Sequence, residues 1–472
     1  LTTIQPNCFS GCEALTSVLF PTHIKTIGSR AFSGCKMLGN IIIPYNIETL
    51  GDGVFNGCSN FTVIDLQQIK FDIDKIPKDL FKGCSRLRKV ILPFDITKIG
   101  DNAFYNCNVL SEINLNAGIT EFGDRCFYNC KILPDDQIHF KTMTSLKTIG
   151  DHAFNGCELL KTLDLIKSNG TLKTISSTAF TDCLLIDEIN FNGCSDLQNA
   201  DFLTVLLGLE TIPDNCFSGC FSSSLLSDIT INLSGNTNLK TINGTAFTDC
   251  SKIKQVSFNG CTILESAKFL SKLKGITILQ GGCFSGCKKL NFDDVIFPPN
   301  LQIIANYAFQ NCGTSRTDVD IYPNGAGGIT INSNTLNKID ENAFDLCSTV
   351  KSIDFNGCKN LESAKFLSKL KGITILQGGC FSGCKKLNFD DVIFPPNLQI
   401  IENYAFKNCG TDLSGVLDAG KITISSNKIT TIGSQAFNGC DTVKSIYFYG
   451  CSQLKSAIFL HQLTSLNFTT IP

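Results

Sequence analysis

Residues 31–44 read Ala31-Phe32-Ser33-Gly34-Cys35-Lys36-Met37-Leu38-Gly39-Asn40-Ile41-Ile42-Ile43-Pro44, and this stretch decides the fold. A Phe followed three residues later by Cys recurs along the 472 residues, sixteen times outside the Phe-Asn-Gly-Cys and Phe-Tyr-Gly-Cys motifs described below. The first Phe-to-Phe intervals are 23, 23, 26, 23 and 23 residues. A fixed period of this length predicts a solenoid, in which each coil buries its apolar face only against its neighbours. The sixteen pairs are Phe9/Cys12, Phe32/Cys35, Phe55/Cys58, Phe81/Cys84, Phe104/Cys107, Phe127/Cys130, Phe154/Cys157, Phe180/Cys183, Phe217/Cys220, Phe247/Cys250, Phe284/Cys287, Phe309/Cys312, Phe344/Cys347, Phe381/Cys384, Phe406/Cys409 and Phe437/Cys440.

Each regular coil predicts one short strand and one turn. The alternation in Ile41-Ile42-Ile43 and in Ile113-Asn114-Leu115 is typical of a strand with one buried face. Pro44 ends the first strand, because proline cannot donate to a ladder. The residue five before each Phe is apolar, as at Ile27, and we expect it to form the opposite wall with the Ala-Phe pair as a short helical turn.

The chain changes its period from about Phe180, where Phe-Asn-Gly-Cys or Phe-Tyr-Gly-Cys motifs enter. These motifs contain Cys194, Cys261, Cys358 and Cys451. Residues 260–314 recur as 357–411, an offset of 97, with changes at four positions.

The longer units also predict inserted elements. Residues 264–275 have apolar side chains at helical spacing and end in Gly275, which predicts a longer helix packed on the outside. The Gly-rich stretch Asn324-Gly325-Ala326-Gly327-Gly328 predicts a loop before strands at 329–331 and 422–424.

The predicted fold class is an α/β repeat solenoid with short parallel strands on one face and short helices or turns on the other. Four long units added to sixteen motifs give about twenty coils of about 23 residues. We therefore expect residues 1–472 to form one continuous solenoid. In it, residues 1–179 make regular coils of 23–27 residues, and residues 180–472 make longer, partly duplicated units with inserted helices and Gly-rich loops.

All 25 cysteines fall at repeat positions. Sixteen follow a Phe, four belong to the second motif, and five directly precede a Phe: Cys8, Cys126, Cys216, Cys283 and Cys380. A small, weakly polar side chain suits such a buried position, so we expect free buried thiols. Disulfides between stacked or i,i+4 cysteines are the alternative, although the odd count excludes complete internal pairing.

Composition excludes some partners. The 40 basic and 42 acidic residues leave a net charge of −2, which gives no electrostatic case for nucleic acid or an anionic membrane. No apolar run approaches the roughly 18 residues of a membrane-spanning helix. The first residues already belong to a repeat and the last break off where another would begin, so we expect a fragment of a longer protein, without signal peptide or anchor.

The stretch from Ala31 to Pro44 resembles the BspA-like, or Treponema pallidum type, leucine-rich repeat, whose coil runs Ala-Phe-x-x-Cys-x-x-Leu-x-x-Ile-x-Ile-Pro. The resemblance covers nearly the whole chain. It implies secreted or surface-anchored proteins that bind host matrix or other cells. It carries no catalytic residues, because the motif residues of that family are structural.

No constellation predicts catalysis, a metal site or a cofactor. The four histidines, His23, His139, His152 and His461, fall at unrelated points of the coil. No Cys-x2-Cys pair is present, so zinc is not expected.

The exposed face of the strands is the candidate binding surface. In each strand the residue between two buried ones points away from the core, and these residues would form one row, roughly 100 Å long over about twenty strands. Their mixed chemistry suits protein recognition better than a polyanion, and a solvated sheet without a ligand is the alternative. The row comprises Leu19, Ile42, Asp65, Ile91, Asn114, Asp164, Asn190, Ser257, Asp354 and Tyr447.

The sequence therefore predicts a non-enzymatic binding protein, secreted or on the cell surface, that adheres to host matrix proteins or other cells through this face. The rival hypothesis is a structural scaffold whose chains stack end to end into filaments.

Overall fold

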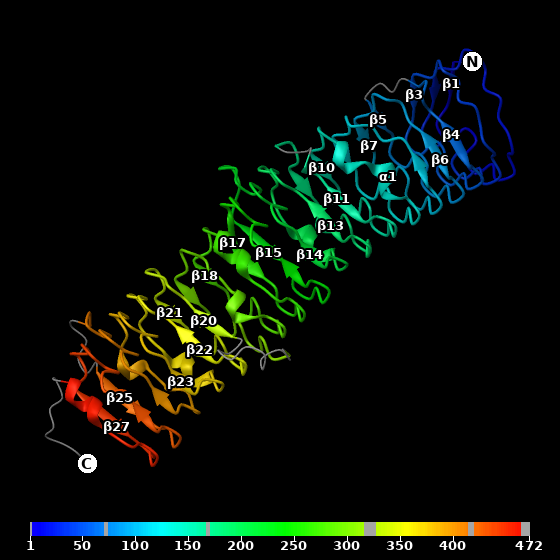
Figure 1. Cartoon of the computed structure of the whole chain (residues 1–472). Helices are drawn as coiled ribbons and strands as arrows, with labels where there is room; N and C mark the ends of the chain where they lie inside the picture. Colours follow the sequence, from blue (N-terminus) through cyan, green and yellow to red (C-terminus); the bar gives the residue numbers. More distant parts are fainter. Residues whose placement is uncertain (1, 70–73, 167–169, 316–326, 414–419, 464–472) are drawn as a thin grey trace. The chain divides into compact units, whose positions relative to one another are not determined.

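The described residues of the computed structural model form solenoid turns of short parallel strands, about 17 turns in all, with little helix, which confirms the predicted fold class (Figure 1). The structure describes all residues except 1, 70–73, 167–169, 316–326, 414–419 and 464–472. The chain divides into two compact units, Leu1–Ile229 with Ala246–Lys252 and Thr230–Thr245 with Ile253–Pro472. That these form one continuous array remains a prediction. Residues 324–326 of the predicted Gly-rich loop lie outside the described residues.

The first unit carries two lines of short parallel strands, visible in Figure 1 as β5 and β7 on one line and β4 and β6 on the other. The first line has the sheets β1 (Thr3–Ile4), β2 (Thr26–Ile27) and β3 (Thr49–Leu50), and β5 (Lys75–Ile76), β7 (Lys98–Ile99), β9 (Glu121–Phe122), β10 (Thr148–Ile149) and β12 (Thr174–Ile175). The second has β4 (Val63–Asp65), β6 (Lys89–Ile91) and β8 (Glu112–Ile113), then β11 (Thr162–Asp164) and β13 (Glu188–Asn190). The described part of the unit also contains β14 (Thr211–Ile212), α1 (Asp135–Ile138) and the 3-10 helices η1 (Phe140–Thr142) and η3 (Asp201–Val205).

The second unit repeats this arrangement. Its three-stranded sheets are β18 (Ile278–Leu279), β19 (Ile303–Ile304) and β21 (Lys338–Ile339), and β23 (Ile375–Leu376), β24 (Ile400–Ile401) and β26 (Thr431–Ile432). Its two-stranded sheets pair β15 (Ile229–Asn232) with β17 (Ile253–Ser257), β20 (Gly328–Thr330) with β22 (Ser352–Asp354), and β25 (Lys421–Ile424) with β27 (Ser445–Phe448). The remaining elements are β16 (Thr241–Ile242) and the 3-10 helices η4 (Lys268–Lys272), η5 (Phe292–Asp294), η6 (Lys365–Lys369), η7 (Phe389–Asp391) and η8 (Ile458–Gln462).

Two local predictions need correction. The wall that precedes each Ala-Phe pair begins as a two-residue parallel strand, such as β2, and only then enters a turn. Residues 41–43 keep the predicted alternation of burial but form no strand. There the side-chain oxygen of Asn40 takes the place of a backbone carbonyl. Its Oδ1 accepts hydrogen bonds from the N–H groups of Thr62 (2.8 Å) and Val63 (3.1 Å) in the next coil.

The Phe/Cys corner joins each coil to the one before it. The rings of Phe81, Phe104 and Phe127 are stacked with centroids 5.7 and 5.1 Å apart, and all three are fully buried. The thiol of Cys107 donates to the backbone oxygen of Phe81 in the preceding coil (3.2 Å). Cysteine is therefore selected here both as a small side chain and as a donor to a buried carbonyl.

The residue before each corner cysteine turns the backbone. Gly34 has φ +77° and Gly83 has φ +74°, and Asn106 and Asn129 take the same place in other coils with φ near +60°. Glycine and asparagine tolerate this left-handed region, which explains why most corners read Phe-x-Gly-Cys or Phe-x-Asn-Cys. Three other corners take the same conformation at Asp182, Asp249 and Leu346.

The Phe-Asn-Gly-Cys motif starts a new column of stacked rings. In the first unit the column that includes Phe154 and Phe180 ends, and Phe191 begins another by stacking on Phe217 (5.2 Å). Phe191 follows β13, and Asn190 is the partner of Asp164 in β11, so the new column grows from the end of a strand. Cys194 donates to the backbone oxygen of Leu165 (3.9 Å), which directly follows β11.

The second unit repeats this shift. Cys261 bonds the oxygen of Leu233 (3.1 Å) and Cys358 that of Ile331 (3.0 Å), while Phe258 and Phe355 begin the new columns. The Phe of each Phe-Asn-Gly-Cys or Phe-Tyr-Gly-Cys motif lies eleven residues after the last Phe of the previous motif series, at Phe191, Phe258, Phe355 and Phe448. A shift therefore adds less than a turn, which explains why about 17 turns form rather than about twenty.

The longer outward helix predicted at 264–275 is wrong. The structure has the five-residue 3-10 helix η4, whose Phe269 and Leu270 are buried. Phe269 packs against Phe258 (5.3 Å), the first ring of the new column. In the duplicated copy Phe366 contacts both Phe344 and Phe355, so this helix closes one column and supports the next.

The stacked rings should dominate stability. Replacing Phe104 by Ala leaves a cavity between two neighbouring rings, and we expect the free energy of unfolding to fall by about 3–5 kcal/mol. Phe94→Ala is the matched control, because that ring is 70% exposed. Urea denaturation of both variants measures the difference. Equal losses would contradict the importance of the column.

Candidate functional site

The candidate face in the first unit is divided by a helix. Asp65 and Ile91 are register partners in β4 and β6, and Asn114 follows β8 in the next coil. Asp164 and Asn190 are partners in β11 and β13. Between these two groups α1 takes the place of a strand, because the Gln137 side chain accepts from the N–H of Ile113 (3.1 Å) and Asp135 accepts from that of Lys161 (2.7 Å). The structure therefore brings these predicted residues together as two patches.

The predicted residues of the second unit lie in three separate two-stranded sheets: Ser257 in β17, Asp354 in β22 and Tyr447 in β27. Ser257 shares a hydrogen bond with the hydroxyl of Ser234 (2.7 Å). The Nζ of Lys421 lies 4.7 Å from the ring centroid of Tyr447. Each of the three directly precedes the Phe of a Phe-Asn-Gly-Cys or Phe-Tyr-Gly-Cys motif. Because they lie in separate sheets, the expected single row is not continuous here.

Several candidate side chains have a structural role. A carboxylate or amide at the strand end accepts from the N–H two residues later, as in an Asx turn. These bonds are Asp65–Gln67 (2.9 Å), Asp164–Ile166 (3.4 Å), Asn190–Asn192 (3.2 Å) and Asp354–Asn356 (2.9 Å). Asn114 instead bonds both the N–H (2.6 Å) and the oxygen (3.0 Å) of Leu92. Turn chemistry thus explains why Asp and Asn are frequent at these positions.

The two apolar candidates at the start of the face are almost fully exposed. Leu19 is 97% and Ile42 90% accessible, and neither belongs to a strand. Ile91 is partly exposed at the end of β6. Nothing in the described part of the first unit covers the first two side chains.

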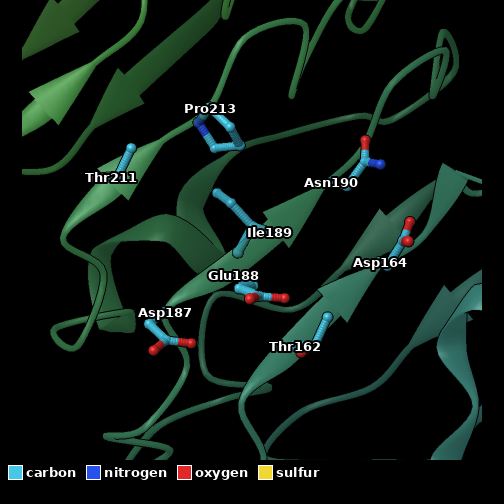
Figure 2. A pocket seen from close by; sticks show the side chains of 8 residues that line it. All are labelled: Thr162, Asp164, Asp187, Glu188, Ile189, Asn190, Thr211 and Pro213. Atoms are coloured by element: carbon cyan, nitrogen blue, oxygen red, sulfur yellow. The ribbon is translucent and has the colours of Figure 1, made fainter.

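A pocket of about 420 Å³ opens on the second patch. Figure 2 shows its lining side chains, which come from β11, β13 and β14 and from the residues beside them. They are Thr162, Asp164, Asp187, Glu188, Ile189, Asn190, Thr211 and Pro213. Two predicted residues, Asp164 and Asn190, therefore meet at one concave site.

Comparison with known families gives a match over nearly the whole chain. The family model of the BspA type leucine-rich repeat region, which contains six copies, matches residues 2–134, 135–203, 185–274, 251–369 and 354–472. The chain is a BspA-type leucine-rich repeat protein. A search of the curated proteins gives no match.

Solved structures similar to this BspA-type protein include three bacterial leucine-rich repeat proteins. One from Bacteroides ovatus is 22% identical, with 84% of this chain and 90% of that chain covered and a TM-score of 0.45. The T. pallidum leucine-rich repeat protein is 27% identical over 34% of this chain and 72% of its own, with a TM-score of 0.28. A leucine-rich cell surface protein from Faecalibacterium prausnitzii is 17% identical, covers 86% of each chain and has a TM-score of 0.23.

The acidic residues of the pocket were missed by the reasoning from strand alternation. Asp187 and Glu188 come from the edge of β13, and Thr162 and Thr211 from neighbouring coils. A sequence signal was present, because residues 174–229 contain no Lys or Arg. The alternation within a strand indicates which side chains of one coil face solvent. It does not indicate which coils contribute side chains to the same pocket.

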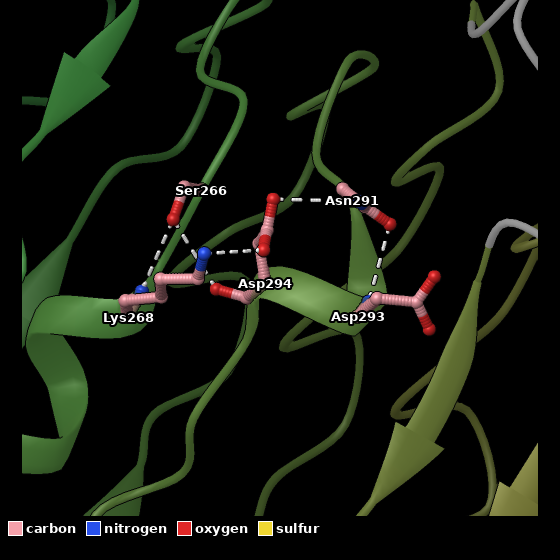
Figure 3. Close-up of polar contacts among 5 residues, drawn as sticks. All are labelled: Ser266, Lys268, Asn291, Asp293 and Asp294. Atoms are coloured by element: carbon pink, nitrogen blue, oxygen red, sulfur yellow. Dashed lines mark hydrogen bonds and ion pairs between the residues drawn. The ribbon is translucent and has the colours of Figure 1, made fainter.

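A second polar cluster of the BspA-type protein is structural (Figure 3). Lys268 pairs with Asp294 (2.7 Å), and the Ser266 hydroxyl donates to the Asp294 backbone oxygen (3.3 Å). Asn291 accepts from the N–H of Asp293 (3.1 Å) and so begins η5. The duplicated copy repeats the contact between Lys365 and Asp391 (2.6 Å), and this hydrogen bond raises the pKa of Lys365. These contacts link two neighbouring coils.

The described residues contain no group of His, Cys, Asp and Glu arranged to hold a metal ion. Within the same residues, no helix has the length and apolar character needed to cross a membrane.

The predicted burial of the cysteines is confirmed for all except Cys8, Cys12 and Cys451, and all 25 are free thiols in the structure. Burial raises the pKa of the Cys58 thiol to about 12, and the same cause raises those of Cys183, Cys250 and Cys440 to about 12. A thiolate is the nucleophilic form of cysteine, so these side chains are poor nucleophiles in the folded protein.

The buried thiols should make the stability of the folded protein fall at alkaline pH. The pKa of Cys58 is higher in the folded protein (about 12) than the ordinary value of 9.0, so its stabilising contribution is complete below about pH 9 and is lost as the pH rises toward 12. Each such thiol lowers the free energy of unfolding by up to about 1.4 kcal/mol per pH unit in this window.

Urea unfolding between about pH 8 and pH 11 measures this slope. We expect Cys58→Ala to reduce the slope of the unfolding free energy against pH by up to about 1.4 kcal/mol per pH unit, which corresponds to one proton. Cys12→Ala removes an exposed thiol and should leave the slope unchanged. Identical slopes in the two variants would refute the assignment.

Proposed function

We propose that this protein binds other proteins through the exposed side chains of the first unit's candidate face, without enzymatic activity, outside the cell or at the cell surface. Leucine-rich repeat proteins generally bind proteins, and BspA-like members are typically secreted or on the surface. Host matrix proteins and other cells are the proposed partners.

The observation that carries this proposal is the exposure of Leu19 and Ile42. Leu19 and Ile42, which are 97% and 90% exposed, lie at equivalent positions of successive coils. Exposed apolar groups bordered by polar ones are typical of protein contact surfaces. The nearby Asp65 and Ile91 give the mixed character of such a surface, with apolar anchors beside a polar rim.

The test is the double variant Leu19→Ser/Ile42→Ser. Both side chains are exposed, so the fold should be retained, and we expect at least about tenfold weaker binding to whichever protein the wild type captures. Solid-phase binding to immobilised fibronectin, fibrinogen and whole cells measures the effect. Leu225→Ser is the matched control, because that leucine is 93% exposed and lies outside the candidate face.

The control should bind like wild type. Binding to none of the three surfaces, or equal binding by the double variant and the wild type, would overturn the proposal. Light scattering on the same samples tests the filament hypothesis, since concentration-dependent polymers without binding would indicate a scaffold.

A further inference from the structure

The first unit concentrates negative charge at one end of its candidate face. Residues 174–229 contain eight acidic residues and no Lys, Arg or His, although the whole chain is nearly neutral at −2. Three of them, Asp187, Glu188 and Glu210, form the acidic patch. Asp187 and Glu188 line the pocket, and Glu210 adjoins Thr211, which lines it from the next coil. All three side chains are exposed.

The acidic patch lacks the cations that neutralise equivalent positions elsewhere. On β6 and β8 the register partners Lys89 and Glu112 form an ion pair (2.6 Å), and Glu112 occupies the position equivalent to Glu188. On the other line of strands, Lys98 and Glu121 of β7 and β9 also pair (2.9 Å). On β11 and β13 the register partner of Glu188 is Thr162. No residue of the acidic patch forms an ion pair with any described residue of the chain.

Two lysines contact residues that line the pocket. Lys141 pairs with Asp164 at 3.7 Å, and Lys161 contributes its backbone oxygen to the N–H of Asp187 (3.1 Å). One lysine is therefore engaged with Asp164, which is only 18% exposed, and the exposed carboxylates remain in excess.

Exposed leucines border the acidic patch. Leu184, Leu185 and Leu207, the leucine cluster, are 59%, 47% and 44% exposed. Leu184 and Leu185 precede Asp187 in the same coil. Gly208 lies so close to the preceding coil that an added Cβ would clash with the carbonyl oxygen of Leu184, which places the backbone at Leu207 near Leu184 and Leu185. An apolar edge and an acidic pocket thus form one surface.

We propose that this surface binds a basic segment of a partner protein, with Lys or Arg in the pocket and an apolar side chain on the leucine cluster. The inference rests on the proposed function and names the chemistry of the partner. Charge complementarity favours a basic partner. The carboxylates of Asp187, Glu188 and Glu210 would attract a cationic side chain and repel an acidic one. A pocket of about 420 Å³ has the size of a small ligand site, sufficient for a long side chain.

The experiment uses the full chain and two fluorescent octapeptides, one alternating Leu with Arg and the other Leu with Glu. Fluorescence anisotropy measures binding. We expect the Leu/Arg peptide alone to bind, and its affinity to fall as NaCl rises from about 50 to about 300 mM, because salt screens exposed charges. Glu188→Lys should weaken binding by at least about tenfold and reduce the salt dependence.

Two further variants separate charge from apolar contact. Leu184→Ser/Leu207→Ser should lower the affinity and leave the salt dependence unchanged. Asp412→Lys makes the same reversal at an exposed carboxylate of the second unit and should change nothing. Equal binding of both peptides, or an affinity unaffected by Glu188→Lys, would overturn the inference. Self-association that Glu188→Lys abolishes would also overturn it, by making a second copy the occupant.

Failure here can be distinguished from failure of the proposed function. Leu19 and Ile42 lie outside the pocket, so protein capture that depends on them and survives Glu188→Lys would retain the binding function and remove only the basic partner.

Discussion

The structure depends on the contact between successive Phe/Cys corners. A buried phenylalanine stacks on the corresponding ring of the next coil, and the following cysteine donates to the backbone oxygen of the previous ring's residue, as Cys58 does to Phe32 (3.2 Å). A coil of about 23 residues cannot bury such a ring alone, so each coil needs its neighbours. The strands that this stacking aligns are only two to five residues long. Side-chain packing, rather than a long hydrogen-bonded ladder, therefore holds the coils in register.

The repeat could be predicted because every coil contains the same motif at the same spacing. The spacing of Phe32 and Cys35 predicted the solenoid, and the alternation around Ile42 predicted which isoleucine faces solvent. The column shift at Phe191 could not be predicted, because a motif shows what a residue contacts only when its neighbouring coil is known. The same limit applies to Asn40, whose side chain replaces a ladder bond in the next coil.

The candidate site was predicted only in part. The alternation of buried and exposed positions correctly predicted that Leu19 and Ile42 are exposed, although neither lies in a strand. The same alternation also selected Asp65 and Asp354, whose carboxylates complete local turns. A polar side chain can therefore face solvent because it hydrogen-bonds the neighbouring backbone, and not because it binds a partner. The pocket around Glu188 joins three coils, and alternation in a single strand contains no information about such a junction.

The column shift also affects how such a chain can be inherited. One complete column runs from Phe258 to the shift at Phe355, and this distance equals the 97-residue offset of the near-identical copies. Unequal recombination between these copies would insert or delete one whole column and leave matching corners at both joints. The number of columns can therefore change in a single genetic event without a mismatch in the core, while the candidate face and pocket of the first unit stay as they are.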